Sequence, residues 1–152
     1  MKTININSNQ VVAAPLDKVW DVVSDVDNDP KYFEQYRDIR NISKEGNKIE
    51  REVTVGFQND KARQTIVLNP RKSVELTITH GPIQGTRITT LSQIDVGRTR
   101  IDISWNFTPS DVPSIDHGMI KSEMTRLTKK ALQKIADELE KKHDDIRNSP
   151  NN

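Results

Sequence analysis

The feature that most constrains the fold is one long amphipathic helix near the C-terminal end of the chain, predicted over residues 116–143. A helix of this length extends for about 42 Å. Because an apolar sheet face must be covered, any sheet in the chain has to pack against this helix. Its apolar side chains recur every three or four positions, and they are Ile120, Met124, Leu127, Ala131, Ile135 and Leu139.

The segment between residues 37 and 107 alternates apolar and polar side chains, which is typical of strands with one buried face. Short turn sequences separate the strands, so successive strands should pair as antiparallel hairpins. Another strand is predicted over residues 3–13, followed by two short helices, one over residues 16–24 and one opened by Pro30. We therefore expect an α+β helix-grip fold, in which a curved antiparallel sheet of about seven strands surrounds the long helix.

The composition argues against several classes of protein. Only 33% of the residues are hydrophobic and 30% are charged, and no apolar run approaches the ~20 residues that cross a membrane. The N-terminus has no apolar signal-peptide segment, and a net charge of +1 gives no general attraction to nucleic acid. We expect a cytoplasmic protein with a single domain over residues 1–143 and a disordered polar tail over residues 144–152.

The sequence contains none of the common catalytic or metal-binding motifs. It has no cysteine and only three histidines, whose spacing does not suggest a metal site. Nucleophile elbows, zinc-protease motifs, phosphate loops and dinucleotide fingerprints are all absent. We therefore expect no metal, no cofactor and no catalytic residue, a pattern that favours a binding protein over an enzyme.

Four segments, taken in order, resemble one known superfamily. They read VVAAPLDKVWDVVSD at residues 11–25, DPKYF at 29–33, ITHGPIQG at 78–85 and GRTRIDISWNFTP at 97–109. Their order and spacing are similar to those of the START/birch-pollen-allergen (SRPBCC) superfamily, in particular its polyketide cyclase/dehydrase and coenzyme-Q-binding-protein branch. One departure is Asp29, at a position where that branch often has an aromatic residue. The resemblance extends from about residue 3 to about residue 143.

This resemblance implies a helix-grip domain with an apolar cavity between sheet and helix. It also implies one of several roles, because fold alone does not determine function. Our first hypothesis is binding or transport of a hydrophobic small molecule or lipid, quinone-like, isoprenoid-like or polyketide-like. The alternatives are a polyketide cyclase/dehydratase and a protein- or ribosome-interaction module. We expect a monomer or weak dimer with no specific nucleic-acid partner, and transient contact with a membrane surface or a protein stays open.

Strand parity and helix spacing predict which side chains surround such a cavity. Trp105 either stacks on a ligand ring or fills the core. Met119 and Met124, on the long helix, give either an adaptable cavity wall or ordinary core filling. The apolar positions expected to converge between sheet and helix are Val53, Val55, Ile78, Trp105, Met124 and Leu127.

Two polar residues share the inward parity of their strands. Arg51 should face inward near a strand end, either in a salt bridge at the rim, with Glu123 as a possible partner, or as an anchor for an acidic ligand head. His80 should reach the cavity rim, either as an acid/base or ligand-binding group or as a structural histidine. In the enzyme hypothesis, these residues or a cavity tyrosine steer the substrate.

The second short helix carries three of the seven aromatic residues in the chain. Tyr32, Phe33 and Tyr36 cluster within five positions. They form either a mouth that admits ligand or a plug that seals the open end of the sheet.

Overall fold

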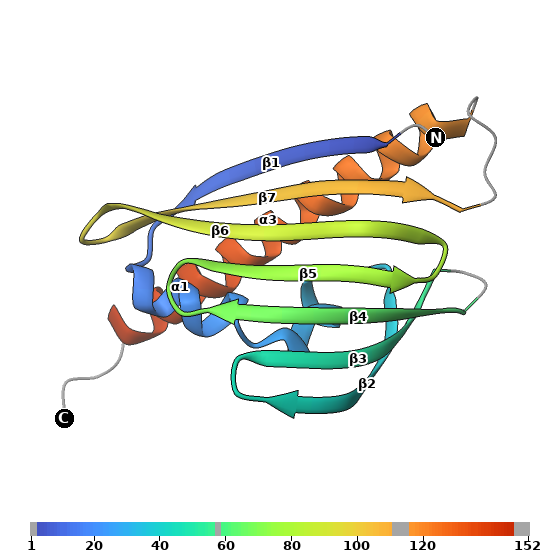
Figure 1. The fold of residues 1–152 in the computed structure, drawn as a ribbon. Helices are drawn as coiled ribbons and strands as arrows, with labels where there is room; N and C mark the ends of the chain where they lie inside the picture. The colour runs from blue at the N-terminus through green and yellow to red at the C-terminus, as the bar shows by residue number, and fades with distance from the viewer. Residues whose placement is uncertain (1–2, 57–58, 111–115, 148–152) are drawn as a thin grey trace.

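The computed structural model describes residues 3–56, 59–110 and 116–147, with residues 142–147 in backbone alone. One antiparallel sheet curves along the long helix α3 (Figure 1), which confirms the expected α+β helix-grip fold. Two short helices follow the first strand, as expected, and a short 3-10 helix lies between them. The elements are β1 (Ile4–Val12), α1 (Leu16–Val23), η1 (Val26–Asn28), α2 (Asp29–Tyr32), β2 (Tyr36–Glu45), β3 (Lys48–Val55), β4 (Asp60–Asn69), β5 (Ser73–His80), β6 (Ile83–Asp95), β7 (Arg98–Pro109) and α3 (His117–Arg147).

The seven strands lie in the order β1-β7-β6-β5-β4-β3-β2. Strands β2 to β7 form a continuous meander, and β1 is added beside β7, where Ile4 pairs with Phe107 and Val12 with Thr99. The alternation predicted for β7 is confirmed, because Ile101, Ile103, Trp105 and Phe107 are all buried. One face of the sheet therefore supplies the core, as the period of two requires.

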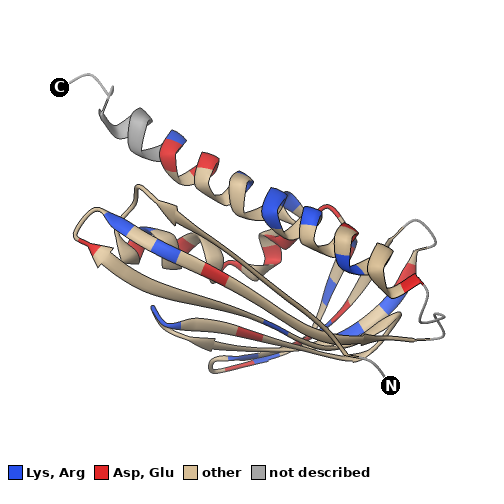
Figure 2. Ribbon diagram, turned by 90° about the horizontal axis from the view of Figure 1, so that it is seen from above, with Lys and Arg blue, Asp and Glu red and all other residues tan. Residues whose placement is uncertain are grey.

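Helix α3 runs along the inner face of the sheet and packs against β1, α1 and α2. The indole N–H of Trp105 donates to the hydroxyl of Thr128, 3.0 Å away, and this bond fixes the middle of α3 against β7. C-terminal to it the helix buries a continuous apolar face; N-terminal to it, Ile120, Met124 and Leu127 are only half-buried. Charges of both signs are interspersed over the molecule (Figure 2).

Three predicted boundaries are wrong. α2 ends at Tyr32, because Phe33 takes an extended conformation (φ −99°, ψ 105°), and Tyr36 begins β2 instead of completing a helix. β6 begins at Ile83, immediately after the Gly81-Pro82 break, whereas the sequence predicts a strand only from Thr86. α3 continues past residue 143, the predicted end of the long helix, to Arg147; residues 148–152 of the expected tail lie outside the described part of the chain.

Two glycines allow close backbone packing at the connection from β5 to β6. Gly81 and Gly85 have positive φ values of 143° and 151°. A Cβ at Gly85 would lie 2.1 Å from the carbonyl oxygen of Asn106, and a Cβ at Gly81 would lie 2.8 Å from the Cβ of Ala62. Only glycine permits both approaches, so this pair holds the β5–β6 connection close to β4 and β7.

Candidate functional site

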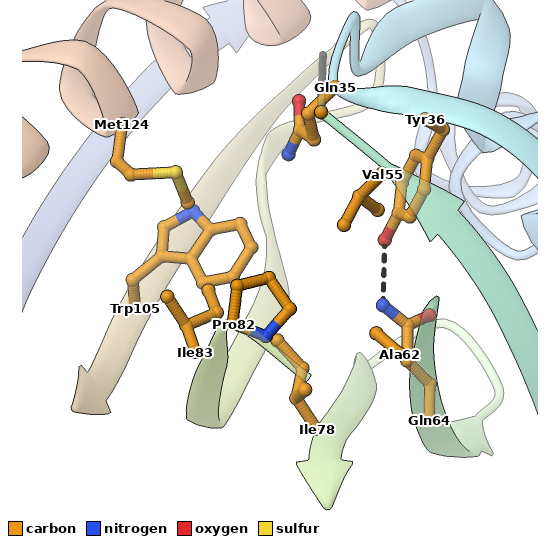
Figure 3. Close-up of a pocket in the computed structure, with 11 residues that line it drawn as sticks. Gln35, Tyr36, Val55, Ala62, Gln64, Ile78, Pro82, Ile83, Trp105 and Met124 are labelled. Carbon is orange, nitrogen blue, oxygen red and sulfur yellow. Dashed lines mark hydrogen bonds between the residues drawn. The ribbon is translucent and has the colours of Figure 1, made fainter. Parts of the chain in front are cut away.

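A cavity of about 160 Å³ lies between the sheet and the N-terminal half of α3. Five of the predicted site residues line it, and they are Tyr36, Val55, Ile78, Trp105 and Met124. Figure 3 shows Met124 and Trp105 on one side of this space and Tyr36 on the other. The wall is mostly apolar, with a few polar groups, as is usual for small-molecule sites.

The remaining wall residues were not predicted as site residues: Gln35, Gly56, Ala62, Gln64, Pro82 and Ile83. The parity of β4 was available as a signal, because Ala62 and Gln64 alternate with exposed or half-exposed neighbours and lead to the buried Ile66. Gln64 gave no signal of its own, because amide side chains are mostly exposed in proteins. Gln35 brings an amide to the cavity, and its Oε1 is buried without a hydrogen-bond partner among the described residues.

Arg51 is fully buried behind the cavity wall, so the expected rim salt bridge is wrong. Its Nη2 lies 2.7 Å from Asp29 Oδ2, its Nη1 donates to the carbonyl of Val26 at 2.8 Å, and its Nε donates to Gln64 Oε1 at 2.9 Å. The partner is Asp29 at the start of α2, because η1 and α2 lie against the inner face of β3. The alternation along β3 predicted the correct face of the sheet for Arg51, but it could not predict which element packs against that face.

Glu123, the expected partner of Arg51, lies on the exposed face of α3 and pairs with Arg126. Hydrogen bonds from Arg126 lower the pKa of this exposed carboxyl. Its distance from the interior follows from helix spacing, because Glu123 is one position away from Met124 and therefore about 100° around the helix. It takes no part in the cavity.

A second buried arginine, Arg87 of β6, joins the same carboxylate. Its Nη2 lies 3.2 Å from Asp29 Oδ2, and its Nη1 donates to the hydroxyl of Tyr36 at 3.4 Å. The guanidinium also lies over the ring of Phe33, 4.1 Å from its centroid. Burial alone would lower the pKa of Arg87, but Tyr36 and Asp29 outweigh burial and raise it, so the group stays charged. The parity of β6 places this residue inward beside Thr89, but its charge suggested the opposite face.

The hydroxyl of Tyr36 connects this ionic cluster (Arg51, Asp29 and Arg87) to the cavity. Gln64 Oε1 accepts from Arg51, so its Nε2 is oriented to donate to Tyr36 Oη at 3.2 Å (Figure 3). Arg87 donates to the same oxygen. The phenol oxygen thus accepts two hydrogen bonds, and its own proton has no acceptor among the described residues. A hydroxyl in this state can donate to a ligand oxygen.

Three predicted site residues lie away from the cavity. His80 is exposed at the end of β5, with Nδ1 3.2 Å from the hydroxyl of Thr79, so its predicted rim position is wrong. The pairing of β4 and β5 shifts between Arg63 and Gln64, which ends the regular alternation before His80. Met119 is 75% exposed, and Leu127 is half-buried without lining the cavity.

The other predicted residues are core positions beside the cavity. Val53 is fully buried, and Tyr32 and Phe33 are buried close to Asp29 and Arg87. On that side of the ionic cluster the interior is almost closed, with a void of only about 10 Å³. Tyr32 and Phe33 therefore pack as a plug, whereas Tyr36 alone of the three lines the cavity.

Within the described residues there is no group of three or more side chains that could hold a metal ion. Among the helices that the structure describes, none is both long enough and apolar enough to cross a membrane.

Comparison with solved structures identifies the architecture. The ZhuI aromatase/cyclase from Streptomyces sp. R1128 superposes with a TM-score of 0.82 at 15% identity, covering 99% of this chain and 100% of that one. A START superfamily protein from Mycobacterium smegmatis gives a TM-score of 0.74 at 11% identity, covering 90% of this chain and 97% of that one. At these identities the likeness is one of fold.

Comparison of sequences gives the family. A Streptomyces halstedii protein, provisionally named as a polyketide cyclase, is 40% identical over 45 residues, which are 30% of this chain and 41% of that protein's length. The match thus spans less than half of that relative. The model of the family described as polyketide cyclase / dehydrase and lipid transport matches residues 3–140. Because this match covers nearly the whole chain, the protein belongs to the polyketide cyclase / dehydrase and lipid transport family, within the START (SRPBCC) superfamily.

Proposed function

We propose that this protein binds a hydrophobic small molecule in the cavity under the N-terminal half of α3. The observation that carries the proposal is a space of about 160 Å³ with an almost entirely apolar wall and three polar side chains, Gln35, Tyr36 and Gln64. An apolar cavity of about 150 Å³ is large enough for benzene. The part of the ligand held inside is therefore the size of one ring, such as the ring of a quinone or of a polyketide.

Binding is better supported than catalysis by the residues at hand. Among the described residues that line the cavity, Tyr36 is the only one with an ionisable side chain. Acid–base catalysis of cyclisation or dehydration usually needs a group that exchanges protons near neutral pH. His80, which the enzyme hypothesis relied on, is exposed outside the cavity. The family includes cyclases, and Tyr36 is the residue through which such activity would act.

Ligand titration followed by fluorescence tests the proposal. In a Trp20→Phe background, the emission of Trp105 should change when toluene or 1,4-naphthoquinone enters, and the melting temperature should rise by mass action. Val55→Phe should weaken both responses, because the added ring occupies the cavity at a strain of about 1–3 kcal/mol. The matched control is Val11→Phe, at a position that is 47% exposed on β1. Equal binding by the two variants would contradict the proposed location.

A further inference from the structure

The buried charges behind the cavity do not balance. Among the described residues, the charged side chains that are buried are Arg51, Arg87 and Asp29, two cations and one anion. Asp27 lowers this excess only from a distance, because its carboxylate is exposed and bonded to Asn41 and Lys44. An uncompensated buried charge is costly, and proteins usually pair it.

Arg87 is the more weakly paired of the two buried cations. Arg51 has three hydrogen bonds, and its contact with Asp29 at 2.7 Å is shorter than the 3.2 Å contact of Arg87. The Nε of Arg87 is buried without a hydrogen-bond partner in the described structure. Its remaining contacts are the hydroxyl of Tyr36 and the aromatic faces of Phe33 and Trp105. An excess of positive charge therefore lies behind the cavity wall, separated from the cavity by one side chain.

Tyr36 transmits this charge to the cavity wall. Its oxygen accepts hydrogen bonds from Arg87 and Gln64, and donation into a hydroxyl oxygen strengthens the hydrogen bond that the hydroxyl itself donates. An acceptor in the cavity that carries negative charge gains most from this arrangement, because charge-assisted hydrogen bonds are about twice as strong as neutral ones. Such an acceptor also supplies the second negative charge that the cluster lacks.

We infer that the cavity selects a one-ring ligand with an acidic oxygen, a ring carboxylate or phenolate, seated against the hydroxyl of Tyr36. This inference rests on the proposed function and goes beyond it, because shape and apolar contact alone would accept a neutral ring equally well. The ring occupies the space between Val55, Ile78 and Trp105. The acidic oxygen accepts from Tyr36, with Arg87 behind it.

A matched set of one-ring probes tests the charge preference by calorimetry at neutral pH. Benzoate, benzamide, toluene and benzylamine are close in size but differ in charge and hydrogen bonding. Benzoate should bind at least tenfold more tightly than benzamide, and benzylamine, a cation at this pH, should bind least. If toluene and benzamide bind as tightly as benzoate, or benzylamine binds more tightly, the inference is overturned and the proposed function stands. If no probe binds, both fail.

Two variants locate the preference. Tyr36→Phe removes the donor and should bring the benzoate-to-benzamide ratio close to one. Arg87→Met removes the excess charge and leaves the Arg51–Asp29 pair balanced, so the protein should still fold and bind toluene but lose its preference for benzoate. Arg63→Met, at an exposed arginine of β4, is the control and should behave as the parent does. Retention of the full preference in both Tyr36→Phe and Arg87→Met would contradict the inference.

Discussion

The two halves of α3 have the same apolar spacing but cover different interiors. In the C-terminal half, Ala131, Leu132, Ile135, Ala136 and Leu139 are at most 3% exposed. In the N-terminal half, Ile120, Met124 and Leu127 are half-buried, and the cavity lies beside Met124. The hydrogen bond between Trp105 and Thr128 marks the boundary between them. One half of the helix closes the core, and the other half covers a space.

This contrast shows what helical spacing reports. Spacing identifies the face of a helix that turns away from water, but not how closely the opposite layer approaches it. In the packed half, the small side chains of Ala131 and Ala136 allow the helix backbone to approach its neighbours. The equivalent face of the other half carries the longer side chains of Ile120 and Met124, which are only half-buried.

The largest expected effect comes from an aspartate placed in each half. Leu132→Asp should cost more than about 4 kcal/mol, because it buries an unpaired charge in a packed region. Leu127→Asp should cost about 1 kcal/mol, because its half-buried position gives the carboxylate access to water. Urea denaturation of the two variants measures the difference. Similar losses in both would contradict the contrast between the two halves.

A smaller effect is expected from truncation to alanine. Leu139→Ala should cost about 2–5 kcal/mol, because it opens a void in a region where the side chain is 3% exposed. Met124→Ala should cost less than about 1 kcal/mol, since it enlarges a cavity that already exists, but it should change the affinity for ring-sized ligands. Thermal melting and ligand titration of the two variants separate these outcomes. A Leu139→Ala protein that keeps its stability but binds ring-sized ligands differently would contradict the assignment of the packed half and the cavity half of α3.

The smallest effect concerns Glu34, which holds α3 next to the boundary through Lys130 at 2.7 Å and Lys134 at 3.1 Å. Hydrogen bonds from these lysines lower the pKa of Glu34 from 4.5 to about 2. A lowered folded-state pKa gives stability that is present above the unfolded value and lost as the pH falls toward about 2. Melting temperatures over this range should fall less steeply in Glu34→Gln than in the parent.

Glu140→Gln, at an exposed position of α3, serves as the control for this pH dependence. Its melting temperatures should follow those of the parent. If Glu34→Gln also follows the parent throughout the acid range, the two lysine contacts contribute nothing to the folded state, as is common for exposed ion pairs.

Most of the fold was predictable because each element has its own local signal. Alternation identified the strands, and three- to four-residue spacing identified α3. The errors arose where local signals end. Phe33 turns the chain out of α2 after one helical turn, and His80 follows a shift in strand pairing, which no sequence period records.

The candidate site was predictable in part, and the limit differs for apolar and polar residues. Val55, Ile78 and Trp105 were found because apolar residues on one strand face must converge. The ionic cluster was missed because Asp29 lies in a sequence typical of turns, and because an arginine such as Arg87 is usually exposed. A buried charge is tolerated only where another element brings its partner, so local sequence cannot reveal it.

The pairing of β1 with β7 has a consequence for how the chain folds. The register joins Ile4 to Phe107, two positions separated by most of the sequence, whereas each of β2 to β6 pairs with the next strand along the chain. Closing so long a loop costs more chain entropy than closing a hairpin, and contacts between distant residues slow folding. During synthesis the meander can assemble while β1 waits for β7 to emerge, and α3, which packs on β1, must follow. Although β1 precedes the other strands of this sheet in the chain, it is thus among the last to be paired, and its apolar face stays open to chaperones or to aggregation until then.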